Sequence, residues 1–300
     1  LCKHKSVLGS SYTQKGRSGF RGKGSCLLHR KGEKQMQPLE LYIHIPFCVK
    51  KCAYCDFLSG PAGEKEKEEY VKMLVDEIRN CPDTVQNYRV ISIFFGGGTP
   101  SLLTGEQIGR LMDTVREIFT LDEDAEITME MNPGTVTEEK LRKYRQAGVN
   151  RLSIGLQSVN DEELRLLGRI HTYEEFLEAY HLARANGFAN INVDLISAIP
   201  GQTVESWRRT LEQVMALSPE HISAYSLILE EGTTFYKKYV EDEAKEGPKL
   251  PDEDAERQMY WDTETLMEKN GYHRYEISNY AKEGYACRHN LGYWERIPYL

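Results

Sequence analysis

The segment LYIHIPFCVKKCAYCDF, residues 41–57, places Cys48, Cys52 and Cys55 in a C-x3-C-x2-C spacing after a short alternating run typical of a β-strand. Zinc sites usually combine two C-x2-C pairs, or a cysteine pair with a histidine pair, and no second pair follows here. Thiolates also suit iron–sulfur clusters, in which three cysteines would leave one iron of a [4Fe-4S] cluster open to another ligand. The spacing favours such a cluster over a zinc knuckle, disulfide partners or free thiols.

The motifs HIPFC and CAYCDF resemble those of the radical S-adenosylmethionine (SAM) superfamily, in which an aromatic residue, here Tyr54, precedes the third cysteine. Within that superfamily the segment is similar to the branch that contains oxygen-independent coproporphyrinogen III oxidase and the HemW-type haem chaperones. The resemblance extends from about Pro38 to Leu300. It implies that the three cysteines bind a [4Fe-4S] cluster and that SAM binds at the open iron.

Composition and charge place the chain among ordinary globular proteins. Its 300 residues are 40% hydrophobic and 28% charged, and no apolar run reaches membrane-spanning length, so we expect a cytoplasmic protein without a transmembrane segment. The formal charge of -8 divides into +8 for residues 1–35 and -16 for the remainder. An acidic body does not favour nucleic acid as a partner.

Residues 1–35 are basic, rich in Gly and Ser, and without helical or strand periodicity, so we expect a disordered segment. We interpret this segment as not part of the mature protein, because members of the family commonly begin near the position of Met36. A transit peptide and a nucleic-acid-binding arm are the alternatives.

Strands and helices alternate along residues 36–230, which predicts a parallel sheet with right-handed crossovers. With the strand before the cysteines there are six β-α units, which suggests a partial TIM-like (β/α)6 barrel, the fold of the radical SAM core. A doubly wound open sheet is the alternative. Residues 231–300 are expected to form a linker and an α+β extension, with a helix over 251–270 and one edge strand over 272–280 that cover the open side. The other expected strands span 90–95, 125–131, 150–157, 190–199 and 221–229, and the expected helices span 64–80, 104–119, 137–147, 161–167, 172–186 and 203–217.

Polar and glycine residues occur where the expected strands end. Gly96, Gly97 and Gly98 follow the strand over 90–95, and three glycines allow close approach to a ligand and leave backbone N–H groups free to bind it. Ligands bind at the carboxyl ends of parallel strands. Three polar residues, Glu130, Gln157 and Asp194, occupy corresponding positions on successive expected strands. The resemblance implies SAM contacts from Tyr42, Tyr54, Gly97, Gly98, Thr99, Glu130, Gln157, Arg169 and Asp194.

The segment CRHNLGYW, residues 287–294, resembles the HNxxYW motif of HemW-type proteins, which is associated there with haem binding. His is a common axial ligand of haem iron, so His289 is a candidate haem ligand and Cys287 a weaker one. A surface helix whose histidine has ordinary structural partners is the alternative interpretation.

Our first hypothesis is a HemW-like haem chaperone that binds a [4Fe-4S] cluster, SAM and haem and delivers haem to apo-haemoproteins. The second is a coproporphyrinogen oxidase that uses a SAM-derived radical for oxidative decarboxylation. It is weakened because Phe57 stands where such oxidases carry a fourth cysteine. A zinc-binding module is the third hypothesis. The family normally extends beyond the equivalent of Leu300, so we expect a fragment, and a homodimer stays a hypothesis.

Overall fold

The computed structural model describes residues 36–242 and 246–300. The predictions for residues 1–35 lie outside the described residues, and the division of the remainder at residue 230 stays a prediction. Within the two described ranges no helix is long and apolar enough to cross a membrane.

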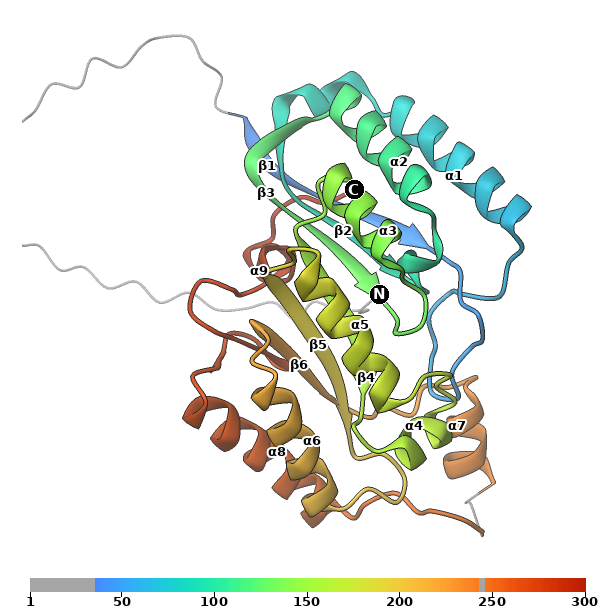
Figure 1. The fold of residues 1–300 in the computed structure, drawn as a ribbon, viewed down its shortest axis with the longest axis vertical. Coiled ribbons are helices and arrows are strands. Elements are labelled where there is room, and N and C mark those ends of the chain that lie inside the picture. Colours follow the sequence, from blue (N-terminus) through green and yellow to red (C-terminus); the bar gives the residue numbers. More distant parts are fainter. Residues whose placement is uncertain (1–35, 243–245) are drawn as a thin grey trace, which may run out of the picture. The chain divides into compact units, whose positions relative to one another are not determined.

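The strands form one eight-stranded sheet in the order β1-β2-β3-β4-β5-β6-β8-β7. Strands β1 to β6 are parallel neighbours in chain order (Figure 1). Among the described residues β1 and β7 do not pair, so the sheet stays open. This arrangement confirms the predicted α/β fold with six parallel strands. The strands are β1 Gln37–Ile45, β2 Tyr88–Gly97, β3 Thr120–Met131, β4 Arg151–Gln157, β5 Asn190–Ser197, β6 His221–Ser226, β7 His273–Arg274 and β8 Asn279–Ala281.

The helices begin and end at the local signals that the sequence carries. Thr104 and Thr172 start their helices with capping boxes, and Gly148 and Gly168 end theirs in the left-handed conformation. The expected helix over 104–119 is therefore observed one residue shorter at each end. The helices are α1 Glu64–Arg79, α2 Gly105–Ile118, α3 Glu138–Ala147, α4 Asp161–Leu167, α5 Tyr173–Ala185, α6 Val204–Ala216, α7 Thr234–Tyr236, α8 Glu253–Lys269 and α9 Arg288–Glu295, with short turns η1 Asp83–Asn87, η2 Pro100–Leu102 and η3 Lys237–Glu241.

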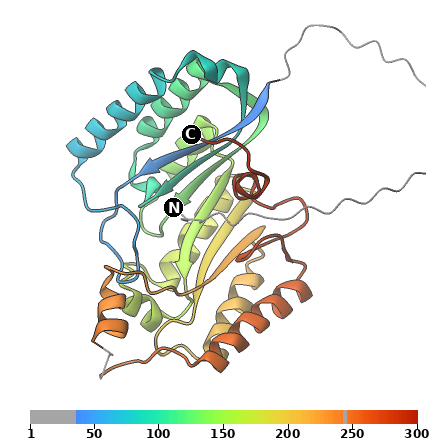
Figure 2. The same cartoon turned by 180° about the vertical axis from the view of Figure 1, so that it is seen from behind.

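The two faces of the sheet differ in chemistry. Helices cover one face of the sheet (Figure 1). Apolar residues such as Ile93, Ile154 and Val193 are fully buried and belong to the hydrophobic core. The residues between them point to the opposite face, because side chains alternate along a strand. The opposite face carries polar side chains, including Ser153 and Asn192, which are hydrogen-bonded to each other. Figure 2 shows the molecule with this face toward the viewer and with α9, in dark red, beside the sheet. The core therefore lies between helices and sheet, and the polar face is left for a site.

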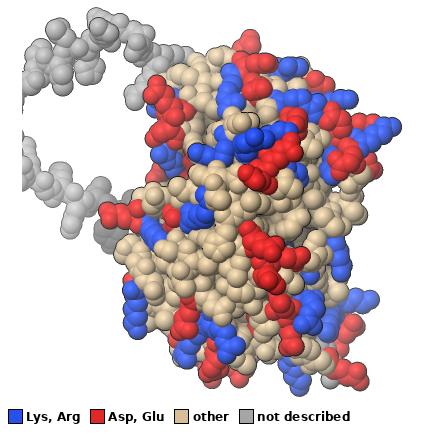
Figure 3. Space-filling view, in the orientation of Figure 1, with Lys and Arg blue, Asp and Glu red and all other residues tan. Residues whose placement is uncertain are grey.

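Acidic and basic side chains are interspersed over the helix-covered face rather than gathered by sign (Figure 3). Several of them join neighbouring helices. The Arg110 guanidinium of α2 lies 2.6 Å from the Glu68 carboxylate of α1, and Arg208 of α6 lies 2.6 Å from Asp262 of α8. Exposed pairs of this kind contribute little each, so the apolar core carries most of the packing.

The C-terminal part differs from the expectation of one edge strand over 272–280. Strands β7 and β8 form a hairpin, and β8 pairs antiparallel with β6. The chain turns because the Ser278 N–H donates to the Glu276 carboxylate at 2.8 Å and the Tyr275 N–H donates to the Asn279 carbonyl at 3.2 Å. The hairpin extends the sheet beyond β6. At the other edge the backbone of Pro298 accepts a bond from the Glu40 N–H at 3.0 Å.

The packing of α8 against α6 generates a test of this extension. Trp207 is fully buried, and its indole N–H donates to the Thr263 hydroxyl of α8 at 2.9 Å. We expect Trp207→Ala to lower the free energy of unfolding by about 3–5 kcal/mol, through the cavity and the lost bond. Thermal unfolding followed by far-UV circular dichroism measures the change. The control is Trp261→Ala, because Trp261 lies on α8 with 54% of its surface exposed. Equal effects of the two substitutions would contradict this packing.

Candidate functional site

The three cysteines lie on a loop that follows β1 at the carboxyl edge of the sheet. The loop is closed where the Cys48 N–H donates to the Gly60 carbonyl at 2.9 Å and the Gly60 N–H donates to the Pro46 carbonyl at 3.0 Å. Its middle is fixed by Ala53, whose N–H donates to the Leu167 carbonyl at 3.0 Å. Cys48, Cys52 and Cys55 are all free and partly exposed. The fold therefore holds three accessible thiols on a braced loop.

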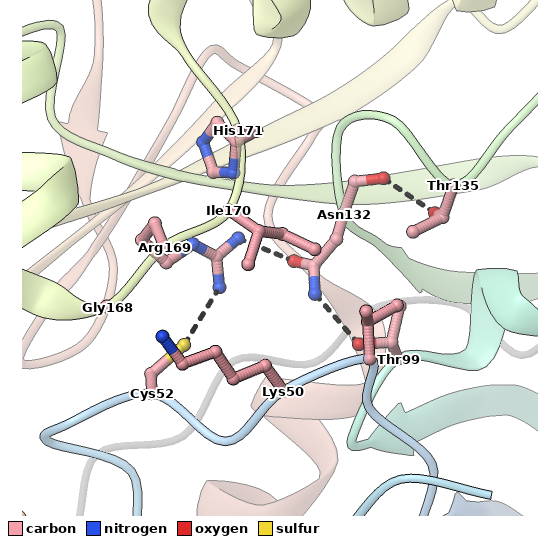
Figure 4. A pocket seen from close by; sticks show the side chains of 10 residues that line it. Lys50, Cys52, Thr99, Asn132, Thr135, Gly168, Arg169, Ile170 and His171 are labelled. Carbon is pink, nitrogen blue, oxygen red and sulfur yellow. Dashed lines mark hydrogen bonds between the residues drawn. The ribbon is translucent and has the colours of Figure 1, made fainter.

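A line of polar side chains connects two of these thiols across the ends of the strands, and Figure 4 shows the part that runs from Thr99 to Cys52. The Thr99 hydroxyl donates to the Cys48 sulfur at 3.6 Å and accepts from the Asn132 amide at 2.8 Å. The Arg169 guanidinium donates to the Asn132 carbonyl oxygen at 2.7 Å and to the Cys52 sulfur at 3.8 Å. Sequence reasoning singled out Thr99 and Arg169 but missed Asn132. Its position directly after β3 is the signal that could have found it.

These residues fit an iron–sulfur cluster. Thiolates are the form that binds iron, and the Arg169 guanidinium donates a hydrogen bond to the Cys52 sulfur. The Arg169 Nε is buried without a partner, so the guanidinium has further donor capacity at this place. Over residues 36–242 and 246–300 no three His, Cys, Asp or Glu side chains converge on one point as a single metal ion requires. A [4Fe-4S] cluster does not need this, because each cysteine binds a different iron.

The glycines at the end of β2 differ from the prediction in one respect. The Gly97 N–H donates to the Glu130 carboxylate at 3.0 Å, and the Gly98 N–H donates to the Ile45 carbonyl at 2.8 Å, so neither amide is free for a ligand. Their lack of a side chain serves close packing. A Cβ on Gly97 would lie 2.5 Å from the His44 ring, and one on Gly98 would lie 2.6 Å from the Phe47 carbonyl oxygen.

Two acids, Glu130 of β3 and Asp194 of β5, lie on the polar face. Burial raises the pKa of Glu130 to about 8, the charge of Asp194 adds to this, and the Gly97 N–H opposes it. Burial also raises the pKa of Asp194, against hydrogen bonds from Asn192 and Ser153 that favour its ionised form. A bound cation would favour the ionised form of both acids.

The remaining predicted SAM-contacting residues lie around this face. Gln157 ends β4 with a φ of 76°, a left-handed conformation that is costly for a residue with a side chain and is typical of functional sites. Tyr42 of β1 is 37% exposed and stacks on Phe94 with ring centroids 6.1 Å apart. Tyr54 packs in a small apolar cluster beside Leu167, where burial raises its pKa. Direct bonds join Thr99 and Arg169 to the cysteines and Gly97 to Glu130, whereas none links Tyr54 or Gln157 to the two acids.

The structure does not support His289 or Cys287 as an open haem ligand. The His289 side chain is 2% exposed, and both ring nitrogens have partners, with Nδ1 2.8 Å from the Ser92 hydroxyl and Nε2 3.0 Å from the Tyr293 hydroxyl. The Cys287 thiol donates to the Glu126 carboxylate at 3.2 Å, and burial raises its pKa to about 12. Iron could reach either residue only if α9 moved.

Comparison with known proteins agrees with this geometry. A sequence model of the radical SAM superfamily matches residues 42–214. The heme chaperone HemW of Escherichia coli is 44% identical over 267 residues, which are 89% of this chain and 68% of the relative. HemW of Haemophilus influenzae is 41% identical over 271 residues, covering 89% and 69%.

A solved structure agrees with the same assignment. Coproporphyrinogen III oxidase (HemN) from Escherichia coli superimposes with a TM-score of 0.75 at 30% identity. The match covers 87% of this chain but 59% of the oxidase, so this chain spans less than two thirds of that protein. The cysteine loop, Glu130 and Asp194 lie within the matched superfamily region. The chain therefore belongs to the radical SAM superfamily, and within it to the HemW family of haem chaperones.

Proposed function

We propose that this protein is a HemW-like haem chaperone that binds a [4Fe-4S] cluster, SAM and haem and delivers haem to apo-haemoproteins. The observation that carries the proposal is the 44% identity, over 89% of the chain, with a relative named heme chaperone HemW. The braced cysteine loop and the acidic polar face support the cluster and SAM parts of it. The cytoplasmic location and a homodimer stay predictions.

In this proposal Cys48, Cys52 and Cys55 hold the cluster. A cluster held there would, when reduced, be the source of an electron for SAM. The chain's own residues position the two groups: Arg169 and the Thr99 hydroxyl direct hydrogens at the cysteine sulfurs. SAM carries a sulfonium and an ammonium group, and the carboxyl groups of the polar face supply charge of the opposite sign.

The alternative is an oxygen-independent coproporphyrinogen III oxidase, and the TM-score of 0.75 with that enzyme favours it. Against it, Phe57 occupies the place at which, by the resemblance, the oxidases carry a further cysteine. The Phe57 side chain is 61% exposed on the cysteine loop and offers no ligand or acid. We therefore rank haem binding above turnover of a tetrapyrrole.

The two functions separate in one experiment. The protein is reconstituted with iron and sulfide without oxygen and then incubated with SAM, a reductant and coproporphyrinogen III, while a parallel sample is titrated with haem. We expect a change in the haem Soret band and no protoporphyrinogen by chromatography. Formation of protoporphyrinogen would contradict the chaperone function and support the oxidase function. A colourless protein that carries stoichiometric zinc would contradict both functions.

The cluster assignment predicts the effect of single cysteine substitutions. Cys48→Ser, Cys52→Ser and Cys55→Ser should each lose most of the bound iron and sulfide, because each removes the ligand of one iron. Iron analysis and the visible absorption of the reconstituted protein measure this. Cys81→Ser is the matched control, since Cys81 is a free, partly buried thiol outside the loop. Full iron content in any of the three loop variants would contradict the assignment.

The raised pKa of Glu130 predicts a pH dependence of SAM binding. Below about pH 8 the Glu130 carboxyl holds a proton, which must leave before the group can pair with a cation. We expect SAM affinity to rise with pH between 6 and 8, by at most about tenfold per unit, and to level off above. In Glu130→Gln the affinity should be weaker and flat. Equilibrium dialysis measures it, with Glu123→Gln, an exposed acid on β3, as control. An unchanged slope in Glu130→Gln would contradict the role of Glu130.

A further inference from the structure

A continuous series of hydrogen bonds runs through the polar face from α9 to Asp194. The Asn290 amide donates to the Tyr275 hydroxyl at 3.1 Å, and that hydroxyl lies 2.8 Å from His221 Nε2. His221 Nδ1 lies 2.6 Å from the Asn192 carbonyl oxygen, and the Asn192 amide nitrogen donates to the Asp194 carboxylate at 2.7 Å. We call these five residues the donor line.

The chemistry of its two ends fixes the direction of every bond in the donor line. An ionised Asp194 only accepts hydrogen bonds, so the NH2 group of Asn192 must face it and the carbonyl of Asn192 must face His221. His221 therefore carries its proton on Nδ1 and accepts at Nε2 from the Tyr275 hydroxyl. That hydroxyl in turn accepts from the Asn290 amide and from the Cys287 N–H at 3.3 Å. Every member donates toward Asp194.

The charges around His221 are consistent with this neutral tautomer. His221 is fully buried, and burial together with the Arg151 cation lowers its pKa well below the ordinary value. A neutral imidazole with one donor and one acceptor nitrogen is what the donor line requires. Aligned hydrogen bonds polarise one another in a poorly solvated interior. The whole donor line therefore stabilises the negative charge of an ionised Asp194 more than the Asn192 bond would alone.

We propose that Asn192, His221 and Tyr275 are positioning residues for SAM: they hold the Asp194 carboxylate ionised and oriented, and they make its position depend on the docking of α9. The inference rests on the proposed function, in which Asp194 contacts SAM. It also assigns a role to Asn290 of the CRHNLGYW segment that does not involve haem. A carboxylate fixed before the ligand arrives loses little freedom on binding, which favours affinity.

The test removes one hydroxyl from the middle of the donor line. Tyr275→Phe keeps the ring and interrupts the line between His221 and Asn290. The matched control is Tyr272→Phe, because Tyr272 lies next to the same hairpin, and its hydroxyl donates to the Pro219 carbonyl at 2.7 Å without any link to Asp194. Both variants lose one hydrogen-bonded tyrosine hydroxyl, so a general loss of stability affects both.

Two measurements on the reconstituted full chain decide the outcome. We expect Tyr275→Phe to weaken SAM binding in equilibrium dialysis by about three- to tenfold at unchanged iron content, and Tyr272→Phe to leave it within about twofold. Nitrogen-15 spectra of the His221 ring, assigned by their loss in His221→Gln, should show a protonated Nδ1 and no titration from pH 5.5 to 8 in the wild type. Tyr275→Phe should shift the Nε2 resonance.

The possible failures are distinguishable. Equal SAM affinity in the two tyrosine variants, or a His221 ring protonated on Nε2, would overturn the donor line while leaving the proposed function intact. A wild-type protein that carries its cluster and does not bind SAM would overturn the proposed function, and with it the role of the donor line. Loss of iron in Tyr275→Phe would overturn the positioning role of the donor line. The line would then be needed for the fold of the cluster site rather than for SAM binding.

Discussion

The rest of this structure depends on the need to pair the polar groups on the inner face of an open parallel sheet. Glu40, fully buried on β1, receives a bond from the Ser92 hydroxyl at 2.9 Å, and burial raises its pKa to about 7. Unpaired, such groups would cost several kcal/mol between them. Helix α9 closes over this end of the face, and it fits because residue 292 is glycine: a Cβ there would lie 2.1 Å from the Glu40 carboxylate. The C-terminal segment thus completes the interior of the six-stranded core.

The sequence predicted the positions of helices and strands well, and it predicted contacts between distant residues poorly. Strand and helix positions follow from local periodicity and caps, so the expected helix over 137–147 and the strand over 150–157 agree with α3 and β4 to within a residue at either end. The contact between Arg169 and Cys52 joins residues 117 positions apart, and only the family resemblance pointed to Arg169. Local patterns carry no information about such partners.

The prediction of one strand over 272–280 was wrong for a related reason, whereas the helix expected over 251–270 is observed as α8. Aromatic alternation over 272–280 resembles a strand, but Tyr275 leaves the sheet edge to bond with His221 inside the fold, and the chain turns around it. For His289, the motif drew attention to ligand chemistry, whereas the fold places the ring among Phe94 and Tyr42 with both nitrogens bonded. A histidine on a helix looks the same in sequence whether it faces solvent or the core.

The occupied amides of Gly97 and Gly98 have a consequence for the discrimination between adenosine cofactors. Glycine-rich turns after a parallel strand commonly grip phosphate through free N–H groups, and ATP shares its adenosine with SAM. Here those N–H groups are used by the Glu130 carboxylate and the Ile45 carbonyl, so the end of β2 offers no such grip to a triphosphate. In their ionised forms, Glu130 and Asp194 would repel a polyanion and attract a sulfonium. If SAM binds as proposed, this turn would therefore favour a cationic adenosine cofactor over a triphosphate.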